Sequence, residues 1–235
     1  MKFTWAARSD TGRVRDHNED ATLPAAGTAG TAEQLVAAVA DGMGGAAGGE
    51  IASATAIATV AAVSGEASIR IEAANLAVVE AAAQRPRLKG MGTTLTLAIF
   101  QAGGQVQIGH VGDSRAYLLR DGALAQVTTD HSFVSEMLTA GRMTEEEAEV
   151  HPYRSVLTRV VGLETAIDVD VQTLDLAAGD RILLCSDGVT AMIDDTGIGA
   201  ALAERDPERA AEALVAAANA AGGIDNISVV LVDAG

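Results

Sequence analysis

Cysteine is almost absent from this sequence: Cys185 is the only one in 235 residues, so no disulfide can form within the chain. Because structural disulfides belong to oxidising compartments, a reducing, cytoplasmic location is expected. The first residues lack the apolar run of a signal peptide. The longest apolar-looking stretch, residues 51–63, contains Ser53, Thr55 and Thr59 and is too short to cross a bilayer, so no membrane insertion is expected.

Basic side chains are scarce as well. Lys and Arg number 16 against 32 Asp and Glu, which gives a net charge of −16. Nucleic acids and anionic membrane surfaces both attract clustered Lys and Arg, so the composition argues against either partner. Aromatic residues make up only 3% of the chain, whereas hydrophobic residues make up 49%. These proportions exclude a globally disordered chain and predict an aliphatic, alanine-rich core.

The first half of the chain alternates between strand and helix signals. Residues 35–40 form a short apolar run that ends at Asp41-Gly42, a pattern typical of a buried strand that runs into a turn. Residues 48–85 predict two helices in tandem, with a break near Gly65. Four strand-like segments follow and are joined as two hairpins: residues 93–101, 105–111, 116–120 and 124–129. Consecutive hairpins indicate an antiparallel sheet.

The second half begins with a polar insertion, residues 131–160, in which Thr144 to Glu147 form a capping-box pattern. Strand signals return at residues 166–174, 181–186 and 227–232. Between the last two, Asp206-Pro207 predicts a helix start and Gly222-Gly223 its end. No repeat and no Pro- or Ser-rich linker divides the chain, so we expect a single α+β domain over residues 1–235, with helices covering its sheets.

Aspartates stand at several transitions between strands and loops: Asp41, Asp113, Asp187 and Asp225. A buried carboxylate at a strand end is unfavourable unless a positive charge compensates it. Several such ends that meet at one point would offer the oxygen ligands that Mg²⁺ and Mn²⁺ prefer. The competing interpretation is that Asp-Gly is a common turn dipeptide, as Asp121-Gly122 illustrates between two short strands.

Two further segments allow a functional or a purely structural interpretation. Residues 42–47 fit a loose G-x-G-x-x-G/A dinucleotide pattern, but the hairpins that follow do not suit a doubly wound fold. The segment from Arg15 to Asp20 joins a guanidinium to several carboxylates. It is either a solvated loop or a site where Arg15 binds a phosphate while Glu19 and Asp20 hold a metal or its waters.

Taken together, these segments resemble, in order, the motifs of the metal-dependent serine/threonine protein phosphatases of type 2C, and the bacterial branch matches best. The resemblance covers about residues 5–233. It rests on seven ordered motifs: Arg15-x-x-Asn18-Glu19-Asp20, Ala40-Asp41-Gly42-Met43-Gly44-Gly45, Gly90-Met91-Gly92-Thr93-Thr94, Gly112-Asp113-Ser114-Arg115, Asp130-His131-Ser132, Ser186-Asp187-Gly188 and Asp225-Asn226-Ile227-Ser228.

The resemblance implies a fold and a metal centre. The fold would be a β-sandwich of two antiparallel sheets flanked by helix pairs, a four-layer α-β-β-α arrangement, with a flap at about residues 131–160. Two Mn²⁺ or Mg²⁺ ions would be bound at one end of the sandwich. By motif position, Asp41 would bridge the two ions, the carbonyl of Gly42 would bind one of them, and Asp187 and Asp225 would complete the other.

The resemblance also assigns roles around this centre. Asp20, and with it Glu19, would order metal-bound waters, and Arg15 would hold the substrate phosphate. Asp113, Asp187 and a group at Ser155 match a third metal site of bacterial relatives. Many bacterial relatives have histidine where this chain has Ala46. Eukaryotic relatives have histidine, a candidate general acid, at the position of Met43. Methionine cannot protonate a leaving group, so a metal-bound water would have to do so.

The activity implied is hydrolysis of phosphoserine and phosphothreonine in proteins by a metal-activated water. Two cations neutralise the phosphate dianion and lower the pKa of a bridging water toward ~7, so no protein nucleophile is needed. The expected partners are phosphorylated proteins, namely the substrates of a bacterial kinase or the kinase itself, and the expected state is a monomer. Two alternatives stay open: a phosphatase dedicated to one stress-signalling regulator, and a phosphoprotein-binding pseudophosphatase.

Overall fold

The computed structural model describes residues 1–44 and 48–235 and contains two six-stranded sheets in which neighbouring strands are antiparallel. One sheet has the order β3 (Ala29–Ala32), β1 (Phe3–Asp10), β12 (Ile227–Ala234), β11 (Arg181–Cys185), β8 (Arg115–Arg120), β9 (Ala123–Gln126). The other has the order β10 (Asp170–Asp175), β7 (Gln105–Val111), β6 (Leu95–Phe100), β4 (Leu35–Met43), β2 (Asp20–Leu23), with β5 (Gly92–Thr93) paired to β4. The predicted pair of antiparallel sheets is confirmed.

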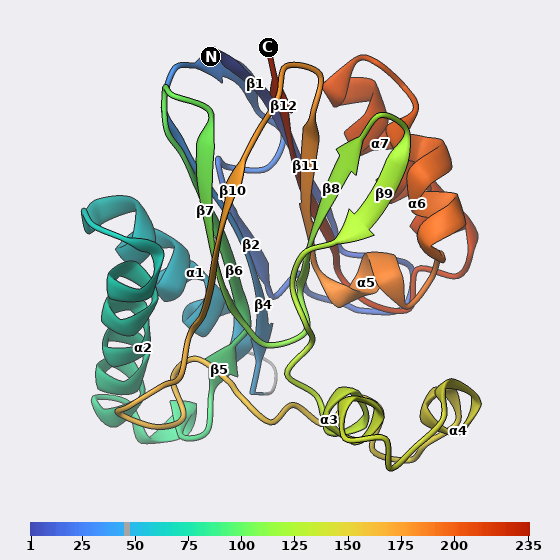
Figure 1. The fold of residues 1–235 in the computed structure, drawn as a ribbon. Helices are drawn as coiled ribbons and strands as arrows, with labels where there is room; N and C mark the ends of the chain where they lie inside the picture. Colours follow the sequence, from blue (N-terminus) through green and yellow to red (C-terminus); the bar gives the residue numbers. More distant parts are fainter. Residues whose placement is uncertain (45–47) are drawn as a thin grey trace.

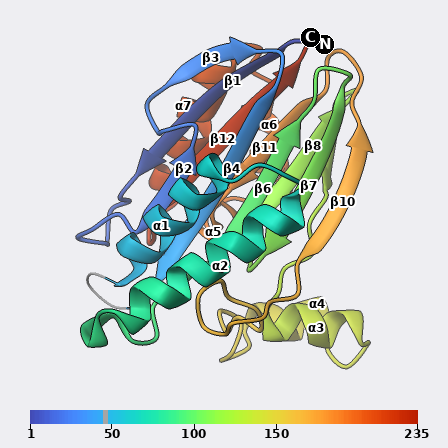
Figure 2. The same cartoon turned by 90° about the vertical axis from the view of Figure 1, so that its left-hand side faces the viewer.

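Helices cover the outer face of each sheet (Figures 1 and 2). The helices α1 (Gly48–Ala62) and α2 (Ala67–Ala83) pack side by side on the β4–β6–β7 face, and the 3₁₀ turn η1 (Pro86–Leu88) follows them. On the other sheet lie α5 (Asp187–Thr190), α6 (Asp195–Leu202) and α7 (Pro207–Ala220). The order of layers is therefore helix, sheet, sheet, helix, as the family resemblance implies.

Three hydrophobic clusters fill the spaces between these four layers. One lies between the sheets around Phe3, Phe100 and Ile182, and one lies under each helical layer. Strands in the middle of the sandwich are consequently buried on both faces, and β11 is buried at every position. Continuous apolar runs, rather than alternating ones, are the expected sequence pattern of such strands, and this is why residues 35–40 and 181–185 were recognisable.

Several local predictions are confirmed. Asp121 and Gly122 have φ angles of 51° and 80° and form the hairpin turn between β8 and β9, because this turn type needs positive φ at both positions. Thr144 and Glu147 form a reciprocal capping box at the start of α4. Asp206 caps α7, which begins at Pro207 as predicted.

The structure differs from the sequence prediction at both edges of the sandwich. No element is predicted before residue 35, yet β1, β2 and β3 lie there; β2 and β3 have only four residues each, too few to show a period. The strand predicted at residues 166–174 begins only at Asp170. Ile167 and Val169 instead pack against the core under α1 and α2, which removes them from the sheet edge.

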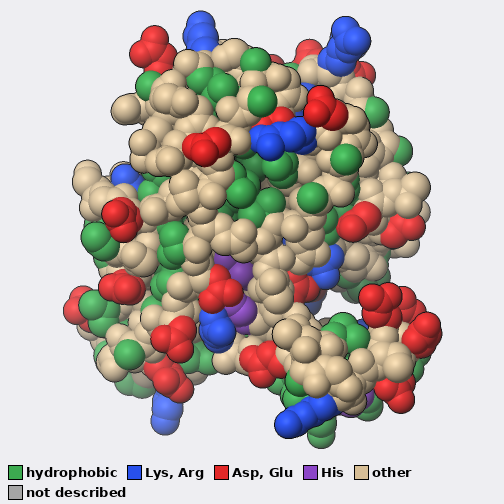
Figure 3. Space-filling model, viewed as in Figure 1, with side chains coloured by type: hydrophobic (Ala, Val, Ile, Leu, Met, Phe, Trp, Pro, Cys, Tyr) green, Lys and Arg blue, Asp and Glu red, His purple; other side chains and the backbone are tan. Residues whose placement is uncertain are grey.

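The polar insertion folds outside the sandwich, at the end opposite the two termini, where α3 (Phe133–Thr139) and α4 (Glu145–Glu149) lie (Figures 1 and 2). Acidic side chains gather over α4 (Figure 3), whose first turn carries three glutamates that favour a helix N-terminus. The division into one domain with a flap at residues 131–160 stays a prediction. Of the helices described, none is both long and apolar enough for a membrane span.

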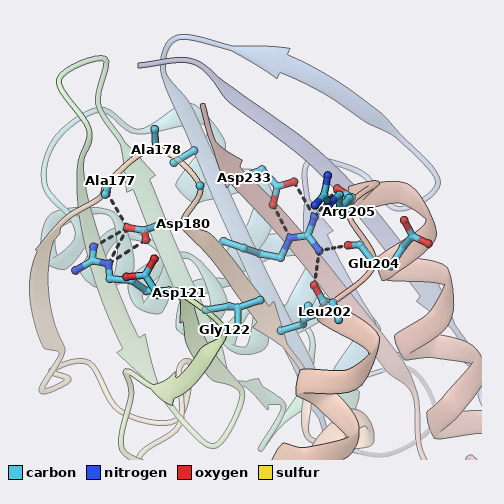
Figure 4. Close-up of a pocket in the computed structure, with 15 residues that line it drawn as sticks. Asp121, Gly122, Ala177, Ala178, Asp180, Leu202, Glu204, Arg205 and Asp233 are labelled. Atoms are coloured by element: carbon cyan, nitrogen blue, oxygen red, sulfur yellow. Dashed lines mark hydrogen bonds and ion pairs between the residues drawn. The ribbon is translucent and has the colours of Figure 1, made fainter.

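A cleft of about 690 Å³ lies at the end of the sandwich that holds the termini. In Figure 4, Asp233, Leu202 and Glu204 converge on one guanidinium, which belongs to Arg181. Arg181 is buried, forms an ion pair with Asp233, and donates to the carbonyls of Leu202, Glu204 and Arg205 at the C-terminal end of α6. Its donors are committed to the fold, so Arg181 is a structural residue that ties the α6–α7 connection to β11.

Replacement of Arg181 by leucine should therefore destabilise the protein strongly. The change leaves the carboxylate of Asp233 unpaired and three carbonyls without a donor, and loss of one partner of a buried pair costs about 3 kcal/mol. Arg8→Leu is the matched control, because Arg8 pairs with two exposed glutamates, and such surface pairs contribute less than about 1 kcal/mol. Urea unfolding of the two variants measures this difference, and equal midpoints would contradict the structural role.

Candidate active site

A second cleft, of about 840 Å³, lies at the opposite end of the sandwich, beside the polar insertion. Segments that are far apart in the sequence form its walls: the β1–β2 loop, the end of β4, the turn that carries Asp113, the segment between α4 and β10, the start of α5 and the residues just before β12. Of the predicted site residues, eight line this cleft: Arg15, Glu19, Asp41, Gly42, Asp113, Ser155, Asp187 and Asp225. Asp20 lies behind the lining, next to Asp41.

Strand pairing places Asp20 and Asp41 together. They are direct partners in the antiparallel register of β2 and β4, which brings both carboxylates to the same end of the sheet. The backbone N–H of Asp41 donates to Thr94 Oγ1 at 2.9 Å, and Thr93 Oγ1 donates to the Asp41 carbonyl at 2.8 Å. These two hydroxyls hold the Asp41 backbone against β5 and β6.

Gly42 follows Asp41 where the chain has no room for a side chain. A Cβ atom at this position would lie 2.2 Å from the carbonyl oxygen of Gly49, the second residue of α1. The close approach of β4 to α1 therefore requires glycine at both Gly42 and Gly49. Ala46 lies outside the described residues, whereas Met43 is exposed and lines the cleft.

Asp187 and Asp225 come from neighbouring strands of the other sheet. Asp187 is the first residue of α5, directly after β11, and Asp225 lies just before β12. The following residue, Gly188, packs so closely on the 225–227 segment that a Cβ there would lie 1.9 Å from the Asn226 carbonyl. Arg15, 51% exposed, reaches across the mouth and donates to Asp225 Oδ2 at 2.6 Å.

Burial, and after it mutual repulsion, disfavours the charged form of the carboxyl groups at this end of the molecule. Burial, together with the neighbouring carboxylates, raises the pKa of Asp20 to about 7. Burial and the charges of Asp187 and Asp130 do the same for Asp113, whose pKa is also about 7. Burial likewise raises the pKa of Asp41, Asp187 and Glu19 above the usual carboxyl range. Among the described residues that line the cleft, Arg15 is the one permanent cation.

The donor atoms fit a hard dication. Three buried carboxylate oxygens, Glu19 Oε1, Asp20 Oδ1 and Asp187 Oδ1, have no hydrogen-bond partner, and such atoms are costly unless a cation or water satisfies them. Within residues 1–44 and 48–235, no three acidic, histidine or cysteine side chains are arranged to enclose an ion by themselves. Mg²⁺ and Mn²⁺ do not need such a cage, because backbone carbonyls and several waters complete their coordination.

Asp113 lies at the same cleft on a separate turn. Ser114 Oγ lies 2.7 Å from Thr94 Oγ1, and Thr96 Oγ1 donates to the Ser114 carbonyl at 2.9 Å. On its other side, the N–H of Gly112 donates to His131 Nδ1 at 3.1 Å. The hydroxyl of Thr94 therefore connects the Asp41 backbone to the Asp113 turn.

Sequence reasoning gave no role to Asn226, although it stands within a quoted motif. Its side chain donates to the carbonyls of Thr11 and His17 and accepts from the N–H of Glu19, each at 2.8 or 2.9 Å. The loop that carries Arg15 is therefore fixed by one amide from the far end of the chain. Only the position of Asn226, directly after an aspartate before an apolar strand, could have signalled this.

Two other side chains that could carry chemistry, Cys185 and His110, have structural surroundings. Cys185 is buried in β11, and burial raises the pKa of its thiol to about 12, so it is not a nucleophile at neutral pH. His110 is buried, and desolvation lowers its pKa to about 3. The dinucleotide interpretation of residues 42–47 is wrong, because the neighbouring strands pair antiparallel and the doubly wound fold needs parallel ones.

Comparison with known proteins agrees with this geometry. Residues 12–217 match the family described as protein phosphatase 2C. The chain is 41% identical to the serine/threonine protein phosphatase PstP of Mycobacterium tuberculosis over 99% of its own length, but it spans only 45% of that relative. It is 39% identical to the serine/threonine phosphatase stp of Listeria monocytogenes, with 96% of this chain and 94% of the relative covered.

Solved structures show the same relationship. The crystal structure of the Mycobacterium tuberculosis serine/threonine phosphatase PstP/Ppp has a TM-score of 0.90 and 39% identity, and the match covers 100% of this chain and 99% of that one. The catalytic domain of PstP in complex with two manganese ions has a TM-score of 0.86 and 38% identity, with 99% of each chain covered. From its sequence, its four-layer fold and its acidic cleft, this chain belongs to the protein phosphatase 2C family.

Proposed function

We propose that this protein is a metal-dependent phosphatase that hydrolyses phosphoserine and phosphothreonine in proteins. The observation that carries the proposal is the cleft between the two sheets, where Arg15 faces a group of carboxylates with unpartnered buried oxygens. A site of this kind binds cations first and, through them and Arg15, a phosphate dianion. The phosphatases named among its relatives, and the two manganese ions in the PstP complex, support the assignment.

The proposed ligands of a two-metal centre are Asp41, the Gly42 carbonyl, Asp187 and Asp225, with Asp20 and Glu19 ordering the surrounding waters. Asp113, Asp187 and Ser155 are proposed for a third, weaker site, and all three line the cleft. Bound Mn²⁺ or Mg²⁺ would neutralise the phosphate and lower the pKa of a coordinated water toward ~7. The unpartnered oxygens of Glu19, Asp20 and Asp187 support this ligand set, because they have no other partner among the described residues.

The residues of the chain itself supply binding and orientation. Arg15 presents a guanidinium that is half exposed at the mouth of the cleft, suited to two hydrogen bonds with one phosphate. Its ion pair with Asp225 fixes the guanidinium over the carboxylate group before a substrate arrives. Asn226 fixes the loop below it. This arrangement requires no protein nucleophile, in agreement with the buried position of Cys185.

The biological setting is a further part of the proposal. The names of the bacterial relatives support phosphorylated proteins as substrates and a serine/threonine kinase as the opposing enzyme. The same cleft would serve an enzyme dedicated to one signalling regulator, and a substrate panel would separate the two. The complete set of acidic residues speaks against a pseudophosphatase. A cytoplasmic location and a monomeric state stay predictions from the sequence.

Metal removal should abolish the activity. We expect hydrolysis of p-nitrophenyl phosphate to require added Mn²⁺ or Mg²⁺ and to stop in excess chelator, because a site completed by waters releases its ions readily. Asp225→Asn should lower kcat at limiting Mn²⁺ by at least about tenfold, because it removes one of the few charged ligands. The matched control is Asp168→Asn, an exposed position outside the cleft. Full turnover in chelator would refute the metal mechanism.

Loss of Arg15 should weaken substrate binding. Arg15→Ala removes a charge-assisted contact that contributes about 1.5–3 kcal/mol, so KM for a phosphopeptide should rise roughly ten- to a hundred-fold. Arg15→Lys should recover part of this loss, since lysine keeps the charge but not the fork. Arg205→Ala, at the other end of the sandwich, serves as the control. An unchanged KM in Arg15→Ala would remove Arg15 from phosphate binding.

The metal-free protein should lose stability as the pH rises. Carboxyl groups with a folded-state pKa near 7 and an unfolded value near 4 bind more protons in the folded state, so the free energy of unfolding falls between about pH 4 and pH 7. In chelator, Tm should therefore be higher at about pH 5.5 than at about pH 8. Mn²⁺ should raise Tm most at the higher pH.

Two variants separate this effect from the titration of the rest of the chain. Asp187→Asn removes one of the repelling charges and should flatten the pH dependence of Tm in chelator. Asp168→Asn lies outside the cleft and should keep the slope of the wild type. If both variants follow the wild type, the carboxylates of the cleft do not control the stability of the metal-free protein.

A further inference from the structure

The rim of the catalytic cleft is apolar although its floor is acidic. Of the eleven large hydrophobic side chains exposed among the described residues, four line this one cleft: Val14, Met43, Val156 and Leu163. Exposed hydrophobic residues scattered singly need no explanation, but a group around a polar site marks a binding surface. We name these four residues the apolar rim.

Leu163 is exposed on a segment that is held rigidly. On one side of it, the N–H of Gly162 donates to Asn75 Oδ1 at 2.7 Å; on the other, the Glu164 carbonyl accepts from Asn75 Nδ2 at 2.8 Å. Asn75 itself is buried in α2. One buried amide thus fixes the backbone on both sides of a leucine whose own side chain stays 49% exposed.

The adjacent backbone reinforces this position. Val161 and Thr93 exchange two hydrogen bonds, of 2.9 and 3.0 Å, across an isolated bridge. A Cβ at Gly92 would lie 3.6 Å from Leu163 Cδ2, so the leucine lies over β5. β5 pairs with β4, the strand that carries Asp41. The fold therefore holds the Leu163 side chain on the cleft wall, although an apolar side chain would be more favourable in the core.

Val14 is presented in a similar way from the β1–β2 loop. The N–H of Arg13 donates to the Gly223 carbonyl at 2.7 Å, and Asn226 binds the loop at Thr11 and His17. Val14 is the most exposed member of the rim, at 65%, and directly precedes Arg15. Val14 and Arg15 line the same cleft, so the apolar side chain and the guanidinium are available to one ligand.

We propose that the apolar rim selects phosphoprotein segments with an aliphatic side chain beside the phosphorylated residue. The inference rests on the proposed phosphatase function and adds its substrate class. The occupant follows from continuity with the phosphate site: Arg15, the carboxylates and the four residues of the apolar rim line the same cleft, so a segment whose phosphate binds there also meets apolar side chains. Preorganised walls lose little entropy on binding, so even a partly exposed contact contributes to selection.

The test compares phosphothreonine peptides that differ only beside the phosphorylated residue. Leucine or asparagine, which have similar size but different polarity, is placed at each of the two positions on either side, and kcat/KM is measured with Mn²⁺. At one position or more, the wild type should prefer leucine by about tenfold, the lower end of what an apolar contact contributes to discrimination. In the Val14→Ser/Leu163→Ser double variant, this ratio should fall to about one.

The control is Leu76→Ser, which removes a similarly exposed leucine of α2 that does not line the cleft, and it should keep the ratio of the wild type. Because each ratio compares two peptides on the same protein, a general loss of activity cancels. A wild type that hydrolyses all the peptides at equal rates, or a double variant that keeps the preference, overturns the inference and leaves the phosphatase function intact. A wild type that hydrolyses none of them overturns both.

Discussion

Repulsion between carboxylates is the constraint on which the rest of this structure depends. At least four aspartates meet at one end of the sandwich, and among the described residues that line the cleft there, Arg15 carries the one guanidinium. Side chains that repel one another have to be held by the backbone. Two such restraints are the contacts of Gly42 with α1 and of Gly188 with Asn226, where a side chain would collide with the backbone. The repulsion that costs stability in the metal-free protein is the same property that binds cations.

Neutral hydrogen bonds complete the support. Thr94 holds the Asp41 backbone and contacts Ser114, while Ser186 donates to Asp20 and Asn226 holds the Arg15 loop. Further cations in these places would have neutralised the aspartates and removed the charge that attracts a metal. Hydroxyls and amides fix positions without changing the net charge of the cleft. Stability is supplied elsewhere, by the aliphatic clusters and by junctions such as that of Arg181.

The sequence could predict what depends on local pattern. Strands buried on both faces appear as apolar runs, and turns and caps such as Asp121-Gly122 and Thr144-Glu147 depend on neighbours within four residues. The aspartates that line the cleft were named through the resemblance of their ordered motifs to a known family. Contacts between distant segments left no local signal: Arg15 meets Asp225 across 210 residues, and the hydrogen bonds of Asn226 and Arg181 require the completed fold. The short β2 and β3 have too few residues to show a period.

The same separation in sequence explains why no sequence pattern predicts the apolar rim. Val14 and Leu163 stand in unrelated loops, and each has polar or glycine neighbours that suggest only a solvated turn. Their common feature is three-dimensional: each sits on a backbone fixed by one buried asparagine, Asn226 or Asn75, and each faces the same cleft. A buried side-chain amide can bind the backbone on both sides of a loop and leave the side chains on the outer face of the loop exposed. The chain thereby keeps exposed apolar side chains in fixed positions, next to the acidic floor at which, in the proposed function, cations and Arg15 would bind phosphate.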